Sequence, residues 1–207
     1  MDLKETEIQE PDASLNNQPS SLRKVGQYVW EIVKIVVISL IIIIPIRLYV
    51  IQPFIVEGDS MMPNFHDGEY LIVDEISYRF NSPQRGDVVI FHPPSDPKNY
   101  FIKRIIGLPG ETVELREGKI YIYNSEYPEG IRLNEANYLT QSSINEESLV
   151  ELADDQYYVV GDNRDNSLDS RRIGPITSVS IKGRAFFRAF PFNSINLLRT
   201  PEYFFNS

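Results

Sequence analysis

The apolar positions of this chain are concentrated in one run, residues 29–51, which is dominated by Ile, Val and Leu. A helix over these residues is about 34 Å long at roughly 1.5 Å per residue, enough to cross a bilayer core of about 30 Å. Near the start, Glu31 and Lys34 lie three residues apart and can pair, and Arg47 near the other end can reach the interface. The pattern predicts a membrane-spanning helix.

Two other interpretations of the run fit less well. A buried core helix would need a neighbouring domain large enough to enclose it, and the rest of the chain is small for that. A cleaved signal peptide has an apolar region of about 7–15 residues, and residues 52–56 lack its small-x-small cleavage pattern. An uncleaved anchor is the better interpretation.

The segments beside the run predict its orientation. Residues 1–28 begin polar and mostly acidic, with nothing that can form a core, so we expect a disordered tail. Arg23 and Lys24 stand just before the run, whereas few basic residues follow it closely. The positive-inside rule therefore predicts a cytoplasmic N-terminus and an extracytoplasmic domain over residues 52–207.

Beyond the run, short stretches rich in β-branched and aromatic residues are typical of strands, so we expect a mainly β fold. Glu117-Gly118 predicts a two-residue hairpin turn, and Leu108-Pro109-Gly110 predicts a type II turn. Residues 124–155 are polar and aperiodic and are expected to form an excursion from the sheet, with some local structure of their own. The predicted strands are residues 70–74, 87–91, 100–107, 112–116, 119–123, 156–160 and 183–190.

Length and charge limit the possible functions. A chain of 207 residues can form one domain of ordinary size with appendages. The formal net charge of −9 argues against a nucleic-acid-binding protein, whose binding face is basic. Because there are no cysteines, the chain has no disulfide scaffold, no thiolate metal site and no cysteine nucleophile.

The stretch Glu57-Gly58-Asp59-Ser60-Met61-Met62-Pro63 follows the apolar run closely. Gly58 is flexible, whereas Pro63 fixes its own φ and favours an extended conformation at Met62. A hydroxyl held on such a loop could be a nucleophile, but a serine in a Gly/Pro turn is more often only a turn residue. Ser60 is therefore a candidate that needs support from other parts of the chain.

Lys103 lies within the predicted strand 100–107, where alternation puts Phe101, Lys103 and Ile105 on one face. A lysine with apolar neighbours is either a gatekeeper on an edge strand, the commoner case, or a partly buried amine. Burial disfavours the charged form and lowers the pKa of a lysine from about 10.4. A neutral Lys103 beside Ser60 could take the hydroxyl proton, which would activate the serine without a histidine.

The two histidines, His66 and His92, belong to no recognisable triad or metal pattern. The order Gly58-x-Ser60-x-Met62 also departs from the Gly-x-Ser-x-Gly elbow at its last position. A triad can still assemble in space, so the histidines remain the second choice for the base.

Residues 161–174 are dense in Asp, Asn, Ser and Arg. A calcium loop does not fit, because counting from Asp165 puts Ser170 at the sixth position instead of Gly and Ile176 at the twelfth instead of Glu. A solvated turn is the simpler alternative. The interleaved Arg and Asp favour a cluster of ion pairs and hydrogen bonds that holds the serine loop and the lysine strand in register.

Together these stretches resemble type I signal peptidases, the membrane-bound Ser-Lys proteases that remove signal peptides from exported proteins. Four segments resemble the family's motifs in the family's order behind a membrane anchor, and they cover most of residues 52–190. The resemblance implies an antiparallel β-domain of the signal-peptidase type. The segments are residues 58–63 (Gly-Asp-Ser-Met-Met-Pro), 85–91 (Arg-Gly-Asp-Val-Val-Ile-Phe), 103–111 (Lys-Arg-Ile-Ile-Gly-Leu-Pro-Gly-Glu) and 161–174, which opens with Gly-Asp-Asn-Arg-Asp-Asn-Ser.

The resemblance implies roles for individual residues. Ser60 would be the nucleophile and Lys103 the general base. Ser167 would orient the lysine amine, and Asp169 with Arg171 would form a supporting ion pair.

Two positions near the dyad follow from the same resemblance. Asp162 would shape the neighbourhood of the dyad. In some family members the residue two before the nucleophile is a serine whose hydroxyl helps to stabilise the oxyanion, and here that position is Gly58. The backbone N–H of Ser60 remains as a donor, and a backbone group or water must replace the hydroxyl, whose loss can lower the rate roughly a hundredfold.

The resemblance also implies the reaction and the partners. The enzyme would cut signal-peptide-bearing preproteins after Ala-x-Ala-like sites, with the peptide extended against a strand edge. The expected partners are these preproteins and the lipid bilayer, without nucleic acid, and the chain is expected to be a monomer without cofactor or metal. The membrane would be the plasma membrane or, in a photosynthetic cell, the thylakoid membrane.

Two rival functions remain. A self-cleaving protease of the LexA type uses the same dyad, but this chain shows no DNA-binding helical domain and its anchor points to exported substrates. An inactive membrane-anchored β-domain could bind partners through the same surface. The presence of both Ser60 and Lys103 argues against the inactive domain.

Overall fold

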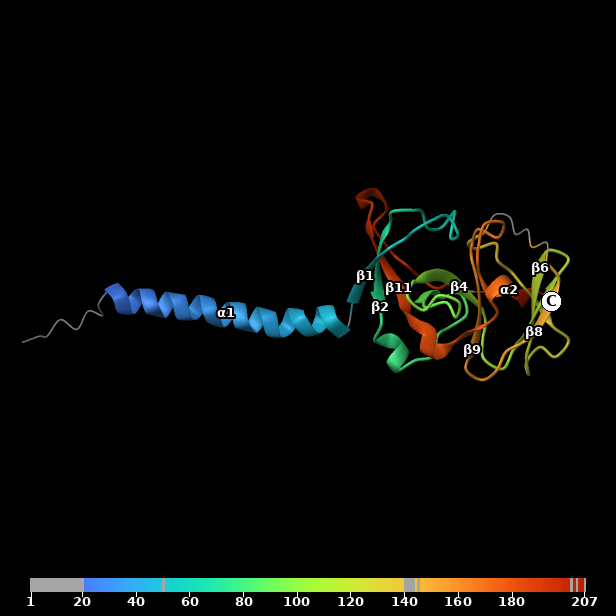
Figure 1. The fold of residues 1–207 in the computed structure, drawn as a ribbon, viewed down its shortest axis with the longest axis horizontal. Helices are drawn as coiled ribbons and strands as arrows, with labels where there is room; N and C mark the ends of the chain where they lie inside the picture. Colours follow the sequence, from blue (N-terminus) through green and yellow to red (C-terminus); the bar gives the residue numbers. More distant parts are fainter. Residues whose placement is uncertain are drawn as a thin grey trace, which may run out of the picture. The chain divides into compact units, whose positions relative to one another are not determined.

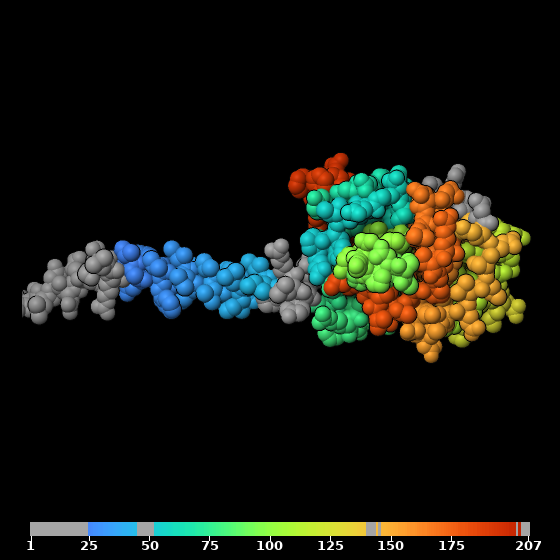
Figure 2. All heavy atoms as spheres, in the orientation of Figure 1, coloured from blue at the N-terminus to red at the C-terminus, as the bar shows by residue number. Residues whose placement is uncertain are grey.

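The structure is a computed structural model that describes residues 21–49, 51–139, 144, 146–201, 203 and 205–206. The described chain divides into two compact units, residues 1–44 and 45–207. Figure 2 shows the helical unit in blue and the β-rich unit in colours from cyan to red. The two units are described separately below.

The long helix α1 spans Ser21–Tyr49 (Figure 1). Within it, Val25–Ile44 has a mean hydropathy of 2.1 and is not buried, so its length and composition suit a membrane span. Lys34 donates to Glu31 at 2.7 Å, as the spacing predicts. The helix begins before the expected start at residue 29, because the preceding residues are compatible with helix and contain no proline. Residues 1–20 of the predicted tail lie outside the described residues.

The larger sheet of the β-rich unit has eight strands, and all its described pairings are antiparallel. Strand β11 lies beside β2 although the two are far apart in the sequence (Figure 1). In spatial order the strands are β1 (Ile51–Ile55), β2 (Tyr70–Asp74), β11 (Ile181–Phe190), β3 (Val88–Phe91), β4 (Phe101–Gly107), β9 (Gln156–Val160) and β10 (Ile176–Thr177), with β12 (Asn196–Leu197) paired to β11.

The smaller sheet has five strands, which are also antiparallel. Its order is β13 (Phe205–Asn206), β7 (Ile131–Leu133), β6 (Lys119–Tyr123), β5 (Thr112–Arg116) and β8 (Ser148–Glu151). The remaining elements are the short helix α2 (Ser170–Ile173) and the 3₁₀ turns η1 (Ser77–Arg79), η2 (Ser178–Ser180) and η3 (Phe192–Ser194). The mainly β, antiparallel fold is therefore confirmed.

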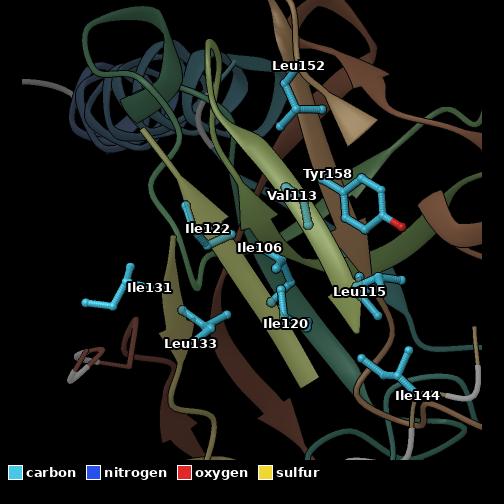
Figure 3. Packing of buried hydrophobic residues seen from close by; sticks show 11 residues of the cluster. Ile106, Val113, Leu115, Ile120, Ile122, Ile131, Leu133, Ile144, Leu152 and Tyr158 are labelled. Carbon is cyan, nitrogen blue, oxygen red and sulfur yellow. The ribbon is translucent and has the colours of Figure 1, made fainter. Parts of the chain in front are cut away.

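The two sheets share a hydrophobic core (Figure 3). Ile106 and Tyr158 of the larger sheet pack with Val113 and Ile120 of the smaller one, and all four are almost fully buried. Burying one such side chain stabilises the fold by roughly 1.5–3 kcal/mol. At Gly107 a Cβ would lie 2.5 Å from Val113, so the close approach of the sheets at this point requires glycine.

The predicted turns are confirmed by the backbone. Glu117 and Gly118 both have positive φ, 50° and 73°, and they connect β5 to β6, as a type I′ hairpin turn requires. Gly110 has a φ of 75° after Pro109, and the N–H of Glu111 donates to the carbonyl of Leu108 at 3.2 Å. This is the geometry of a type II turn.

Two expectations about strands need correction. Residues 124–155 do not leave the sheet altogether, because β7 and β8 arise from them and pair with β6 and β5. Strand β1 was not expected, since Pro53 lies within it and proline cannot donate to a ladder. Proline is tolerated there because β1 is an edge strand that pairs only with β2 in the described sheet.

Candidate active site

Ser60 lies on the loop that connects β1 to β2. Backbone hydrogen bonds from Val56 N to Glu69 O and from Gly68 N to Val56 O, both 2.9 Å, close the loop. Met61 is fully buried and packs in the same hydrophobic cluster as Leu71. This packing fixes the position of the adjacent Ser60. Ser60 itself is half-buried, which leaves its hydroxyl at the surface of a rigid loop.

Lys103 lies in β4, between β3 and β9. It is 4% exposed, so it is the buried amine of the two alternatives and not an exposed gatekeeper. Its Nζ lies 2.7 Å from Oγ of Ser60 and donates to the carbonyl of Ile102 at 2.8 Å. The ring of Phe101 lies on the same face, with its centroid 5.4 Å from Nζ. The structure therefore brings the two main candidates into hydrogen-bond contact.

The surroundings of Lys103 favour the neutral amine. Burial is the largest cause and lowers its pKa, and Arg171 acts in the same direction. The carboxylates of Asp169 and Asp162 oppose this and favour the charged form. The pKa of Lys103 falls to about 8 as a result, so a substantial fraction of the amine is neutral near that pH.

The segment after β9 holds the serine loop from the other side. The backbone N–H of Asn163 donates to the carbonyl of Ser60 at 3.0 Å, and the side-chain amide of Asn163 donates to the carbonyl of Asp59 at 3.1 Å. At Gly161 a Cβ would lie 2.2 Å from Oγ of Ser167 and 2.5 Å from the carbonyl oxygen of Ser60. Only a glycine allows the two segments to approach this closely.

Ser167 is 5% exposed and lies against Gly161. Its Oγ has no hydrogen bond of regular geometry within the described residues, although it is near enough to Asp169 to help lower the pKa of that carboxyl. The predicted contact between Ser167 and the amine of Lys103 stays a prediction.

Asp169 and Arg171 form the expected ion pair. Arg171 donates from Nε at 2.8 Å and from Nη2 at 2.9 Å, and the N–H of Gly161 adds a third hydrogen bond at 2.9 Å. Asp169 also caps α2 by accepting from the N–H of Arg171. Burial raises the pKa of Asp169, but these hydrogen bonds outweigh burial and hold its pKa below the usual value.

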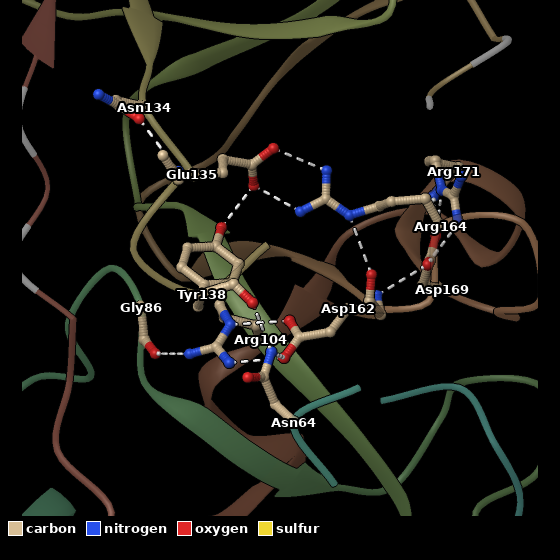
Figure 4. Close-up of polar contacts among 12 residues, drawn as sticks. Asn64, Gly86, Arg104, Asn134, Glu135, Tyr138, Asp162, Arg164, Asp169 and Arg171 are labelled. Atoms are coloured by element: carbon tan, nitrogen blue, oxygen red, sulfur yellow. Dashed lines mark hydrogen bonds and ion pairs between the residues drawn. The ribbon is translucent and has the colours of Figure 1, made fainter. Parts of the chain in front are cut away.

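Asp162 connects all three segments (Figure 4). Arg104, next to Lys103 in β4, donates to it from Nε at 2.8 Å and from Nη2 at 2.6 Å. Asn64, on the loop of Ser60, donates to the same carboxylate at 2.8 Å. The structure thus contains the predicted cluster, in which hydrogen bonds to Asp162 connect the serine loop with the lysine strand.

The cluster continues on the far side of Arg104. Arg164 donates to the carbonyl of Gly161 at 3.0 Å and to both oxygens of Glu135, and Tyr138 also donates to Glu135 (Figure 4). Because the carboxylates of Asp162 and Asp169 are committed to arginines, the segment fits an ion-pair cluster better than a calcium loop. Among the described residues no group of three potential metal ligands is found.

The two histidines lie apart from this arrangement. His66 has a side chain that is 56% exposed and faces Glu69 at 3.5 Å. His92 contacts the carbonyl of Asn99 at 3.1 Å and the ring of Tyr100. Neither contact involves Ser60, so the lysine remains the better candidate for the base.

Sequence analysis did not single out Asn64 or Glu135. Asn64 bridges Asp162 and the carbonyl of Tyr138, and Glu135 binds Arg164. The only signal for Asn64 was its position four residues after Ser60, where an asparagine in a turn has an ordinary explanation. Glu135 lies in the aperiodic region, and its pairing depends on tertiary structure.

Gly58 stands where some family members have a serine that helps to stabilise the oxyanion, and it has a φ of 79°. A side chain there would have open space but a strained backbone. The N–H of Gly58 donates to Oδ1 of Asp67 at 2.7 Å, so that donor is already used. The expectation that another backbone group or a water molecule supplies the second oxyanion donor stays a prediction.

A cleft of about 730 Å³ opens beside the dyad. One wall is β1 and the residues that follow it, and the other is the first half of β4. Across the cleft, the rings of Phe54 and Tyr100 meet edge to face with centroids 5.0 Å apart. The pairing of β4 with β9 begins at Arg104, so Phe101–Lys103 have a strand neighbour on one side only. Both walls therefore include backbone that has no strand partner in the described sheet.

The comparisons with known proteins identify the family. The family model described as signal peptidase, peptidase S26, matches residues 29–190. A probable signal peptidase I-1 from Synechocystis sp. is 36% identical over 181 residues, which is 84% of this chain and 89% of the relative. Signal peptidase I T from Bacillus subtilis is 35% identical over 188 residues, 89% of this chain and 96% of the relative.

Among solved structures, a signal peptidase I from Enterococcus faecalis is 31% identical to this chain. The match covers 50% of this chain and 97% of the chain in that structure, with a TM-score of 0.41. The family match and the relatives cover most of the sequence, including all the segments that form the site. The chain belongs to the peptidase S26 family of signal peptidases.

Proposed function

We propose that this chain is a membrane-anchored serine endopeptidase that removes signal peptides from exported preproteins, with Ser60 as nucleophile and Lys103 as general base. The observation that carries the proposal is the 2.7 Å contact between Nζ of the buried Lys103 and Oγ of Ser60. A nucleophile and base within about 2.6–3.2 Å of each other are the signature of this type of catalysis. Family membership supplies the class of reaction.

In the proposed reaction, neutral Lys103 accepts the proton of Ser60 while Oγ bonds to the scissile carbonyl carbon. The backbone N–H of Ser60 stabilises the oxyanion that forms. When the tetrahedral intermediate collapses, the C–N bond breaks and Lys103 returns the proton to the leaving amine. Water then attacks the acyl carbon while Lys103 accepts a proton from it. Lys103 passes that proton to Oγ of Ser60 as the acyl C–Oγ bond breaks and the cleaved signal peptide leaves with its new carboxyl group.

The remaining site residues are proposed to position this dyad. Asp169 and Arg171 fix the segment that packs against Ser60, and Ser167 orients the amine of Lys103. Asp162 holds Arg104 and Asn64, and through them the strand of the base and the loop of the nucleophile. Because reacting atoms must be held within fractions of an ångström, such supports act on the rate without touching the substrate.

The cleft beside the dyad suits an extended peptide. Its walls offer unpaired strand backbone, to which a substrate could add as a strand, and mostly apolar side chains. We propose that the residues before the cut lie here and that small ones, as in Ala-x-Ala, fit between the walls. Preproteins are the proposed partners, and the enzyme is proposed to act as a monomer.

Helix α1 is proposed as the anchor, with a cytoplasmic N-terminus and the β-rich unit on the other side of a plasma or thylakoid membrane. The test adds protease to the outside of intact spheroplasts, whose plasma membrane is sealed. We expect the β-rich unit to be digested, while full protection would reverse the orientation.

The first test of the activity is cleavage of a preprotein with an Ala-x-Ala site by the detergent-solubilised full chain. We expect wild type to cut after the small residue and Ser60→Ala and Lys103→Ala to lose at least about a thousandfold in rate. Lys119→Ala, which removes a lysine from β6 in the smaller sheet, is the matched control and should keep full activity. Circular dichroism confirms that each variant is folded.

Other outcomes would favour the rivals. A wild type that cuts only its own chain, at a rate independent of its concentration, would support self-cleavage of the LexA type. An inactive wild type with a sound substrate control would support the inactive binding domain. An active Lys103→Ala would place the base elsewhere, and His66 and His92 would be examined next.

A further inference from the structure

A second cavity, of about 790 Å³, lies in the β-rich unit, and neither Ser60 nor Lys103 lines it. Its walls come from β11, from the start of β3, from the loop after Ser60 and from the C-terminal segment 195–201. The volume falls within the roughly 300–1,000 Å³ of small-molecule sites. The reaction proposed above makes no use of this cavity.

The cavity gathers positive charge in an acidic protein. The whole chain has a formal net charge of −9, yet the charged residues that line the cavity include only one carboxylate, that of Asp87. The basic residues on its walls are Arg104, Arg184, Arg188 and Arg199. A concave surface with an excess of one charge concentrates ions of the opposite sign.

Two of the arginines are held in place by partners. Arg104 binds the carboxylate of Asp162 with two hydrogen bonds, as Figure 4 shows. Arg188 lies 2.8 Å from a carboxylate oxygen of Glu69 and donates to the carbonyl of Asn64 at 2.5 Å. These two side chains therefore form fixed walls of the cavity.

The other two arginines have donors left to offer. The side chain of Arg184 is 29% exposed, and its Nη1 lies 3.7 Å from an oxygen of Asp87, beyond hydrogen-bond distance. The carboxylate of Asp87 instead accepts from the hydroxyls of Tyr78 and Thr200. Arg199 is exposed and makes no ion pair or hydrogen bond with the described part of the chain. Guanidinium donors that the protein leaves unused at the wall of a cavity are available to a ligand with acceptor oxygens.

We propose that this cavity binds a small phosphate-bearing molecule through Arg184 and Arg199. The guanidinium group donates in a planar fork that matches the oxygens of a phosphate, which explains why arginines rather than lysines gather here. The cavity has room for more than a free phosphate ion, which favours a phosphate ester as the ligand. Its source is either a soluble metabolite or the glycerophosphate headgroup of an anionic lipid.

The experiment titrates the detergent-solubilised full chain with glycerol 3-phosphate, and with glycerol as the control without phosphate, at constant ionic strength. Isothermal calorimetry should give saturable binding with a dissociation constant of about 1 mM or lower. The thermal midpoint should rise with the phosphate ester and not with glycerol, because a ligand of the folded state stabilises it.

Matched variants locate the site. Arg199→Gln and Arg184→Gln should each weaken binding about tenfold, the size expected for losing a charge-assisted contact. Arg132→Gln makes the same change at an exposed position on β7 that does not line the cavity, and it should bind like wild type. Arg199 is exposed, so its variant should fold and decides the question even if Arg184→Gln unfolds.

A second arm identifies the source of the ligand. The full chain is reconstituted in vesicles of phosphatidylcholine with or without phosphatidylglycerol, and glycerol 3-phosphate is titrated again. Weaker apparent binding in the presence of phosphatidylglycerol identifies the lipid headgroup as a competitor, whereas unchanged binding identifies a soluble ester. No saturable binding by wild type, or binding that both arginine variants leave unchanged, overturns the proposal.

Discussion

Lys103 and Arg104 are neighbours in β4, each is 4% exposed, and both carry a basic side chain, yet their surroundings differ. Arg104 points into the polar cluster and is bound twice by Asp162. Lys103 points to the opposite face, where its amine contacts a hydroxyl, a carbonyl and the ring of Phe101. The carboxylates of Asp162 and Asp169 act on the amine only over a longer distance.

The difference in surroundings suits Arg104 to a structural role and Lys103 to a chemical one. Burial lowers the pKa of both groups, but the hydrogen bonds and charge of Asp162 outweigh burial at Arg104 and raise its pKa. At Lys103 burial prevails and the pKa falls to about 8. A buried cation with a carboxylate in contact is a structural element, while one without such a contact tends to lose its proton and can act as a base.

The largest expected effect comes from removing the partner of Arg104. Asp162→Leu leaves a guanidinium buried without its carboxylate, and we expect a loss of about 3–5 kcal/mol in the free energy of unfolding. The double variant Arg104→Met with Asp162→Leu should recover most of that loss, because neither charge of the pair remains. Urea unfolding of the full chain in detergent measures both, and a single variant as stable as wild type would contradict the assignment of a buried ion pair.

The opposite change is expected at Lys103. Lys103→Met removes a cation that burial disfavours, so at pH 7 the variant should be more stable than wild type by about 3 kcal/mol, the equivalent of lowering the pKa from 10.5 to about 8. Between these two values the unfolded chain binds more protons than the folded one, so the wild type gains stability as the pH rises. The advantage of the variant should therefore shrink between pH 8 and 10.5.

Lys119→Met provides the control for this pH dependence. Lys119 is only half-buried on β6, and the same substitution there is expected to change stability by less than about 1 kcal/mol. A constant difference between wild type and Lys103→Met across the pH range would mean that the amine is not destabilised by burial.

The activity of the wild type should depend on the same proton. Since the base is the neutral amine, kcat/KM should be near its plateau above pH 8 and fall about tenfold per pH unit below it, to about a hundredth at pH 6. The measurement is cleavage of the Ala-x-Ala preprotein from pH 5 to 10. A flat profile down to pH 5 would exclude Lys103 as the base.

Gly161→Ala tests the contact that keeps Ser60 beside Lys103. The added Cβ would lie 2.5 Å from the carbonyl oxygen of Ser60, so the serine loop must move, and we expect activity to fall by up to about a hundredfold. Gly118→Ala is the control, because its φ of 73° carries the strain of an alanine without a close contact in the hairpin of the smaller sheet. It should lose about 1 kcal/mol of stability and keep its activity, and equal activity in both variants would refute the packing argument.

The elements near the dyad were predictable because they follow local rules. Alternation in β4 placed Lys103 and Arg104 on opposite faces, and the motifs around Ser60 and Asp162 identified the segments that meet. Whether Lys103 was a gatekeeper or a buried amine could not be read from the sequence. The answer depends on the serine loop, 43 residues earlier in the chain, whose Ser60 contacts the buried amine in the folded protein.

The missed elements depend on partners distant in the sequence. Strand β1 contains Pro53 and is a strand only because β2 pairs with it. The three-residue strand β7 has too few positions to show a period, and it is stabilised by β6 and β13 on its two sides. Asn64 and Glu135 were missed for the same reason, since each acts through a contact made in the folded chain.

The change of neighbours along β4 has a consequence for amide hydrogen exchange. The N–H of Ile105 donates to Asp87 on the side of β3, so by alternation the N–H of Ile102 points to the other side, where the cleft lies. From Arg104 onward that side is covered by β9. Exchange at Ile102 is therefore expected to be fast in the free protein and slow once an extended peptide pairs with it, while Arg104 stays protected throughout. The base lies at the boundary between these two regimes, so the amide of Ile102 would report the arrival of a substrate beside Lys103.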